Sequence, residues 1–354
     1  MAARRGRIPG LPWGALVVLL VAGPCTAQPS PGLHADVTLS DYPPSASGQE
    51  IVRRLLTPLA AAQVERTLRA SHQELPAASL DLATERFTVF VPAHQPHAGY
   101  ALLVFIAPWP QARVPPGWQE ALEREGAVFV SAARSGNEAN DLARRAPLAL
   151  VAAASLSRQL PVDPARVYVA GFSGGARVAL RLALAYPDVF RGALLNAGSD
   201  PIDAGPPSPP SPALLHAFQL GARIVYVTGA EDAAHLRMDS DSQESLRRFC
   251  QFDYHAEVTP RVGHEVAGAA AFAGALRELL RPATPEADRV QGCNTALQKA
   301  VEAQLQRVSA LMAGGRRAQA QEALIGLDRK FGGLAAPRSV ALEDELGWQL
   351  PAGR

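Results

Sequence analysis

A serine in a glycine-rich pentapeptide is the residue of this sequence best suited to covalent chemistry. Ser173 is the central residue of "GFSGG", which fits the pattern G-x-S-x-G of a nucleophile elbow. In such an elbow a strand turns so tightly into a helix that the serine is exposed in a strained conformation and its neighbours must lack bulk. Gly171 and Gly175 supply that room. An ordinary small-residue turn or a phosphate-binding loop is the alternative interpretation.

A serine hydroxyl is a weak nucleophile near neutral pH, so it needs a base, and the base needs an orienting acid. In chains with a nucleophile elbow both follow the serine, first the acid and then a histidine. Asp232 follows the apolar run "ARIVYVTG", and His264 comes shortly after the run "YHAEVTP". We therefore predict that Ser173 is the nucleophile, His264 the general base and Asp232 the orienting acid.

Other residues compete for two of these roles. His235 follows the same apolar run as Asp232, and it is either a rival base or a residue that lines the pocket. Glu231 and Asp200 are the rival acids, and an ordinary solvated carboxylate is the alternative for each acid. Chain order favours His264 and Asp232.

Short apolar runs alternate with helical patterns between residues 85 and 280. The runs are "RFTVFVP", "YALLVFIA", "GAVFVSA", "RVYVAG", "GALLNAG", "ARIVYVTG" and "YHAEVTP". This alternation predicts an α/β fold with a mostly parallel sheet and helices on both faces. In such sheets ligands bind beyond the carboxyl ends of the strands, which is where Ser173 is expected.

The longest of these motifs resembles a known group of enzymes. The run "GFSGGARVALRLALAYPDVFRGALLNAG", preceded by "VDPARVYVA" and followed by "VTGAEDAAH" and "VGHE", resembles the dienelactone-hydrolase and poly(3-hydroxybutyrate)-depolymerase-like serine esterases. These belong to the α/β-hydrolase superfamily, and the resemblance covers about residues 79–280. It implies an α/β-hydrolase fold in which Ser173 attacks, His264 acts as base and then acid, and Asp232 fixes the imidazole.

One loop departs from the pattern of these relatives. Many of them carry a His-Gly pair after the strand that corresponds to "ALLVFIA", whereas this chain continues with "APWPQARVPPGW". Prolines have no N–H to donate, so the N–H of Trp109 is the candidate oxyanion donor, together with the N–H of Gly174. The alternative is that Trp109 only packs beside the pocket.

Two further segments bear on the substrate. Asn137 and Asn140 follow the run "GAVFVSA", either within reach of a substrate or as helix caps. The proline-rich stretch "DPIDAGPPSPPSPALL" is too short for a large cap, which predicts a site open to solvent or to a polymer surface.

The ends of the chain are expected to lie outside the hydrolase domain of residues 79–282. Basic residues followed by "GALVVLLVAG" predict a signal peptide over residues 1–27 with cleavage after Ala27; a lipid anchor at Cys25 is the competing interpretation. Residues 28–48 are assigned no fixed structure, and residues 49–71 predict a peripheral helix broken at Pro58. Residues 283–354 predict a helical extension, a hairpin with its break at Gly314.

Two cysteines, Cys250 and Cys293, remain once the leader is removed. In an oxidising compartment they are a candidate disulfide, and two buried free thiols are the alternative.

Composition limits the partners. The 354 residues carry a formal net charge of +1, which gives no reason to expect a nucleic-acid partner. The sequence has no C-x-x-C pair, no H-E-x-x-H helix and no P-loop, so we expect no cofactor and no metal. The hypothesis is a secreted or periplasmic serine hydrolase without a membrane span in its mature chain, acting on a small ester or a polyester. A serine peptidase and a non-catalytic binding protein on the same fold are the alternatives.

Overall fold

The structure is a computed structural model that describes residue 2 and residues 29–205, 207–284 and 286–347. The expected signal peptide lies, apart from Ala2, outside these residues. None of the helices in the described ranges combines the length and the apolar character that crossing a bilayer requires.

Eight strands of the described residues form one sheet in the order β1-β2-β4-β3-β5-β6-β7-β8. The strands are β1 (Gly32–Val37), β2 (Phe87–Val91), β3 (Tyr100–Ile106), β4 (Ala127–Ala132), β5 (Val162–Phe172), β6 (Gly192–Asn196), β7 (Arg223–Gly229) and β8 (Tyr254–Thr259). Pairing is antiparallel from β1 to β2 and from β2 to β4, and parallel in the rest of the sheet. This strand order confirms the expected α/β-hydrolase fold.

Helices bury both faces of the sheet, as the apolar runs of its central strands require. All seven residues of β3 are buried. Successive side chains of a strand point to opposite faces, so Val104 packs into the core beneath α4 (Ala146–Gln159) and α5 (Gly174–Ala185). Phe105 packs into the opposite core with α3 (Gln119–Glu125) and α8 (Ala269–Leu280).

The remaining helices lie around the first of these cores. They are α1 (Gly48–Leu55), α2 (Pro58–Ala70), α6 (Pro212–Gly221), α7 (Ala233–Arg248), α9 (Ala287–Ala313), α10 (Arg317–Phe331) and α11 (Arg338–Leu346). A π-helical turn, Asp141–Arg145, leads into α4, and 3₁₀ turns occur at Pro44–Ala46, Leu82–Thr84 and Gly332–Leu334.

The expectation that residues 28–48 have no fixed structure is wrong. Residues Gly32–Val37 form β1, which pairs antiparallel with β2 at the edge of the sheet. Composition pointed to a loop because local proline and serine dominate it, whereas the hydrogen bonds that fix β1 come from a strand some 55 residues later in the chain, as in the pairing of Leu33 with Phe90.

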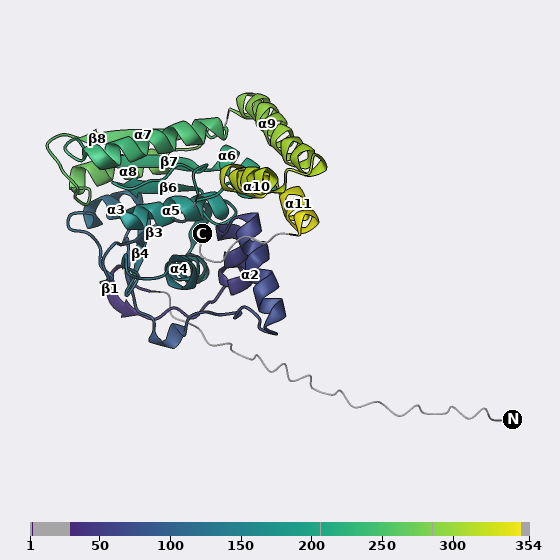
Figure 1. Cartoon of the computed structure of the whole chain (residues 1–354). Helices are drawn as coiled ribbons and strands as arrows, with labels where there is room; N and C mark the ends of the chain where they lie inside the picture. Colours follow the sequence, from purple (N-terminus) through teal and green to yellow (C-terminus); the bar gives the residue numbers. More distant parts are fainter. Residues whose placement is uncertain (1, 3–28, 206, 285, 348–354) are drawn as a thin grey trace.

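The N-terminal helices and the C-terminal helices gather on the same side of the molecule (Figure 1). The break at Pro58 is present, with Thr57 capping α2. The expected hairpin is present as α9 and α10, joined at Gly314, and the structure adds α11, which contacts α2. Leu305 of α9 and Leu324 of α10 belong to the same hydrophobic cluster as α4 and α5, so the extension packs against the hydrolase core.

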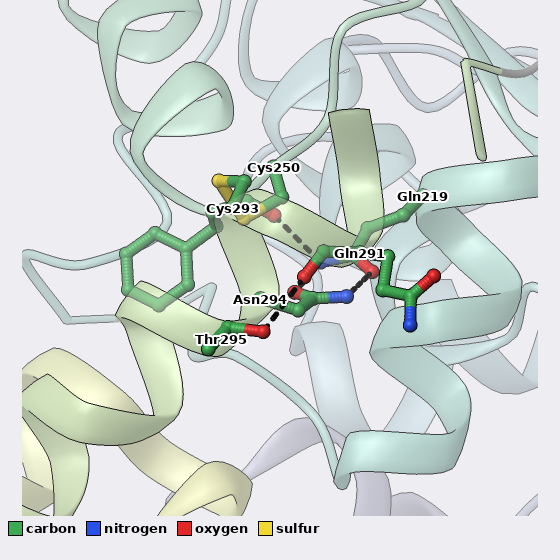
Figure 2. The surroundings of a disulfide bond; sticks show 7 residues. Gln219, Cys250, Gln291, Cys293, Asn294 and Thr295 are labelled. Carbon is green, nitrogen blue, oxygen red and sulfur yellow. Dashed lines mark hydrogen bonds between the residues drawn. A yellow bond between two sulfur atoms is a disulfide. The ribbon is translucent and has the colours of Figure 1, made fainter. Parts of the chain in front are cut away.

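A disulfide between Cys250 and Cys293 ties α9 to the end of α7 (Figure 2). Next to it, the side-chain amides of Gln219 in α6 and Asn294 in α9 exchange two hydrogen bonds, each 2.8 Å long. Gln219 also donates to the carbonyl of Phe249 at 2.9 Å. One covalent bond and a satisfied polar cluster therefore fix the start of the C-terminal extension to the hydrolase core.

Candidate active site

Ser173 occupies the sharp turn between β5 and α5. Its φ of 53° and ψ of −124° are unfavourable for a residue with a side chain, which costs about 1–3 kcal/mol. Its N–H donates to the carbonyl of Asn196 at 2.8 Å, so the neighbouring strand β6 fixes the turn. A Cβ on Gly175 would lie 1.9 Å from the carbonyl oxygen of Ile106, which explains why this position must be glycine. The geometry is that of a nucleophile elbow.

His264 reaches Ser173 from the loop between β8 and α8. Its Nε2 lies 3.0 Å from the Ser173 Oγ, within hydrogen-bond distance. The loop is held from two sides at Ala267, whose N–H donates to the side chain of Asn196 at 2.7 Å and whose carbonyl accepts from the Trp118 indole at 2.8 Å. The imidazole ring also stacks on Phe172, 5.0 Å between centroids. These contacts restrict the imidazole to one position.

Asp232 lies behind the imidazole, at the start of α7. Its Oδ2 is 2.7 Å from the Nδ1 of His264, and only 6% of its side chain is exposed, against 39% for His264. Burial alone would raise the pKa of Asp232, but hydrogen bonds from His235 and His264 outweigh burial and lower it. The carboxylate is therefore ionised near neutral pH and holds a proton on the Nδ1 of His264.

The rival histidine, His235, binds the same carboxylate, whereas it is His264 that is hydrogen-bonded to Ser173. Its Nδ1 lies 2.8 Å from the Asp232 Oδ1, and its backbone N–H donates to that oxygen at 3.3 Å. The His235 and His264 rings are stacked, with centroids 4.1 Å apart and planes 17° apart. Each carboxylate oxygen of Asp232 thus accepts a hydrogen bond from one imidazole ring.

The rival acids lie elsewhere. Asp200 pairs with Arg177 of α5 at 2.8 Å, and Glu231 is exposed beside Asp232. Of the three acids considered, Asp232 is the one hydrogen-bonded to His264.

The second loop expected at the site, around Trp109, is fixed through its carbonyls. The carbonyl of Ala107 accepts from the buried Arg145 guanidinium at 3.2 Å, and that of Pro108 accepts from the N–H of Asn137 at 3.1 Å. In a trans peptide the N–H is opposite the carbonyl, so the N–H of Trp109 points away from Asn137. Gly174 is the first residue of α5, where an N–H has no partner within the helix.

The Trp109 side chain packs, as the alternative interpretation expected. Its ring lies 6.2 Å from Phe105 and 6.1 Å from Phe172, with the Arg113 guanidinium 4.5 Å over one face. The indole Nε1 is buried and finds no acceptor among the described residues. Packing of the side chain does not use the backbone N–H, so both roles are compatible.

The remaining expected residues divide between the site and its surroundings. Asn140 is a helix cap, because its side chain accepts from the N–H groups of Leu142 and Ala143. Asn137 lies against Gly174: a Cβ added to that glycine would be 2.3 Å from the Asn137 Oδ1. The proline-rich segment runs to the C-terminal helices, where the carbonyl of Pro209 accepts from Gly333 at 2.8 Å.

The cluster of Asp232, His235 and His264 has the composition of a metal site, with ligand atoms within 4.8 Å of one another. Both Nδ1 atoms, however, face carboxylate oxygens as hydrogen-bond partners. The rings are nearly parallel, so their in-plane lone pairs do not converge on one point as tetrahedral coordination requires. The cluster fits a hydrogen-bonded network better than a metal centre.

Several residues that build this site were missed in the sequence. Asn196 and Arg145 hold the two loops, and Trp118 holds the far side of the His264 loop. Asn196 carried a signal, since it is a polar residue at the carboxyl end of a buried strand. Arg145 carried none, because an arginine in a helical pattern is ordinarily an exposed charge.

No family model and no curated protein matches the chain, whereas solved structures do. It is similar to a ferulic acid esterase (14% identity, TM-score 0.42), over 55% of this chain and 90% of that one. A dienelactone hydrolase from Anabaena variabilis ATCC 29413 is 18% identical with a TM-score of 0.38, over 55% of this chain and 90% of that one. Porphyromonas gingivalis dipeptidyl peptidase 4 is 14% identical with a TM-score of 0.38, and the match covers 52% of this chain and 31% of that one. The strand order and the elbow after β5 define the fold of this chain as the α/β-hydrolase fold. This is the fold that the resemblance of the sequence implies.

Proposed function

We propose that the protein is an exported serine hydrolase that cleaves carboxylic esters through an acyl-enzyme. The observation that carries the proposal is the continuous chain of hydrogen bonds from the Ser173 Oγ through His264 to Asp232, with the serine on a strained elbow. This arrangement gives the hydroxyl a base, gives the base an orienting acid, and exposes the nucleophile to a substrate.

In the acylation step, Ser173 attacks the ester carbonyl carbon while His264 takes the hydroxyl proton on Nε2. The tetrahedral intermediate collapses when His264 returns that proton to the leaving alkoxide, which releases the alcohol. A water molecule then attacks the acyl-enzyme by the same route, and the acid product leaves with Ser173 regenerated. Asp232 stays ionised throughout and stabilises the imidazolium that forms in each step.

The oxyanion of each intermediate is assigned to the N–H groups of Gly174 and Trp109. Support comes from the position of Gly174 at the start of α5 and from the hydrogen bonds by which Arg145 and Asn137 hold the carbonyls of Ala107 and Pro108. A non-catalytic protein would be favoured by a loop that closes this space. Losing one donor of such a pair typically costs about 100- to 1000-fold in rate.

The substrate is assigned as a small ester or a polyester. His264 is 39% exposed, and the proline-rich segment extends toward the C-terminal helices, both of which favour access from solvent. Esters are favoured over amides because the ester carbonyl is less stabilised by resonance and an alkoxide is a far better leaving group than an amide anion.

The test compares two substrate classes with the mature protein. We expect p-nitrophenyl acetate and butyrate to be hydrolysed at least about 100-fold more efficiently, by kcat/KM, than aminoacyl p-nitroanilides. Comparable rates on both classes would favour a peptidase. If a folded protein hydrolyses neither class, the result would favour a non-catalytic binding protein.

Export is proposed from the N-terminal sequence and is supported by the Cys250–Cys293 disulfide, since such bonds persist in oxidising compartments. Cleavage after Ala27 predicts Gln28 as the first residue of the exported protein. Expression of the full chain followed by N-terminal sequencing of the extracytoplasmic fraction tests this, and retention of the intact leader on a cytoplasmic protein would contradict it.

A further inference from the structure

We propose that the side-chain amide of Asn137 is a third donor to the oxyanion, alongside the N–H groups of Gly174 and Trp109. The inference deepens the proposed function and rests on it, since an oxyanion forms at this place only if Ser173 attacks a carbonyl carbon. It gives a catalytic role to a residue of the loop that follows β4.

The loop after β3 can offer the oxyanion few backbone donors. Pro108 and Pro110 have no N–H, so Trp109 is the one residue of this proline pair's loop segment that can donate. Neither its N–H nor that of Gly174 has an acceptor among the described residues. Both are therefore free to bind an oxyanion, and a further donor would have to come from a neighbouring loop.

Asn137 lies between the two segments that carry these donors. Its backbone N–H donates to the carbonyl of Pro108 at 3.1 Å, which joins it to the Trp109 loop. Its side chain packs against the start of α5, because a Cβ added to Gly174 would lie 2.3 Å from the Asn137 Oδ1 and 3.1 Å from its Nδ2. The amide is therefore beside the residue that directly follows the nucleophile.

Arg145 determines which end of the Asn137 amide is available. Its Nη2 lies 3.5 Å from the Asn137 Oδ1 and also donates to the carbonyl of Ala107 at 3.2 Å. A guanidinium has donors and no acceptor, so the amide presents its oxygen to Arg145 and directs its NH₂ group elsewhere. Within the described part of the chain, Nδ2 donates to no protein acceptor. Since Asn137 is an exposed residue, this donor is open to a substrate.

The orientation of the amide is set before a substrate arrives, because Arg145 is itself fixed. Only 4% of its side chain is exposed, and it donates to the carbonyl of Ser135 at 3.0 Å and to Asp141 at 3.1 Å. A hydrogen bond from a cation to the amide oxygen polarises the amide, which strengthens its N–H groups as donors. Preorganised donors of this kind stabilise the charge that develops in the transition state.

The test measures kcat and KM for p-nitrophenyl butyrate with wild type, Asn137→Ala and Asn137→Asp. Loss of the donor should lower kcat about 100- to 1000-fold and leave KM within about threefold, because the oxyanion is present only in the transition state. Asn137→Asp keeps an oxygen for Arg145 but replaces the donor with a charged acceptor, so we expect a loss at least as large as in Asn137→Ala.

Asn140→Ala is the matched control, since it removes the same type of side chain from the same loop. Asn140 caps the following helical turn through the N–H groups of Leu142 and Ala143. We expect kcat of this variant to stay within about threefold of wild type.

A transition-state analogue separates the loss of a donor from damage to the fold. With an aliphatic trifluoromethyl ketone, the Ser173 Oγ bonds to the ketone carbon, the carbonyl π electrons move to the oxygen, and the hydroxyl proton passes to the His264 Nε2. The adduct carries an oxyanion in the same place, so its inhibition constant should rise by about the factor by which kcat/KM falls. A partly misfolded variant would have fewer active molecules and an unchanged inhibition constant.

An Asn137→Asp variant that keeps the wild-type kcat would overturn the proposal, because Asn137 would then act only by holding the loop to Arg145. A loss of kcat without a matching rise in the inhibition constant, or an equal loss in Asn140→Ala, would also overturn it. In each of these cases an active wild type leaves the proposed function intact. A folded wild type that neither hydrolyses esters nor binds the ketone would contradict the proposed function, and this role with it.

Discussion

Asn196 and Ser173 are joined by a hydrogen bond of 2.8 Å, from the serine N–H to the asparagine carbonyl. The side chain of the same asparagine accepts from Ala267 at 2.7 Å and donates to the carbonyl of Val227 at 2.9 Å. One residue at the end of β6 thus fixes both the elbow and the loop that carries His264. The nucleophile and the base keep their 3.0 Å separation because they share this support.

We expect Asn196→Ala to lower kcat for ester hydrolysis about ten- to hundredfold, because a shift of the His264 loop by about 1 Å is enough to misalign the base. The variant also leaves the buried N–H of Ala267 without a partner, which we expect to cost about 1–3 kcal/mol of unfolding free energy. Gln219→Ala is the matched control, since it removes another buried amide with comparable hydrogen bonds far from the site. Equal losses of kcat in the two variants would mean that Asn196 acts through stability alone.

Asp232→Asn is expected to lower kcat about 10⁴-fold with little change in the fold, because an amide no longer favours the Nδ1–H tautomer and cannot stabilise the imidazolium. Asp200→Asn, which removes the rival carboxylate paired with Arg177, should stay within a fewfold of wild type. Steady-state kinetics on p-nitrophenyl butyrate decide between them. A large loss in Asp200→Asn and a small one in Asp232→Asn would reverse the assignment.

Removal of the disulfide by a Cys250→Ala, Cys293→Ala double substitution is expected to destabilise the protein. The two cysteines are 43 residues apart, and closing a loop of that length is worth about 4 kcal/mol through the entropy of the unfolded chain. Urea unfolding with and without reductant gives the measurement, since reductant should affect the wild type but not the double variant. Identical unfolding midpoints for oxidised and reduced wild type would contradict this prediction.

Asp328 makes part of the stability depend on pH. Burial raises its pKa to about 6, although its Oδ1 accepts the N–H of Leu59 at the start of α2. Between about pH 4 and pH 6 the folded chain holds a proton that the unfolded chain has lost, so stability falls as pH rises through this window. Above it the penalty is complete, at about 3 kcal/mol.

Asp328→Asn keeps an acceptor for Leu59 and removes the charge. We expect the variant to have a higher Tm than wild type at pH 7.5 and a nearly equal Tm at pH 4.5. Calorimetry at the two pH values is the measurement. A variant that is less stable than wild type at pH 7.5 would show that the ionised carboxylate is favourable where it lies.

The elements of the fold that follow from local pattern were predictable. β3 is apolar at every position and β7 is apolar over Ile224–Val227, and the elbow at Ser173 has a local signature, because turn geometry restricts its neighbours to glycine. β1 was missed because its hydrogen bonds come from β2, far along the chain.

The same distinction holds within the candidate site. Chain order pointed to Asp232 and His264, which the structure brings together with Ser173. Chain order could not show that His235 binds the second carboxylate oxygen, nor that Arg145 is buried against the carbonyl of Ala107, since both depend on which loops meet at the edge of the sheet.

The central claim is that Ser173 is the nucleophile, and covalent labelling tests it most directly. The mature wild type and Ser173→Ala would be treated with a fluorophosphonate probe and assayed on p-nitrophenyl butyrate. We predict that the wild type is labelled at Ser173 and turns over the ester, while Ser173→Ala is not labelled and loses about 10⁴-fold or more of the activity. A folded wild type that takes up no label, or a Ser173→Ala variant that keeps both label and turnover, would contradict the account.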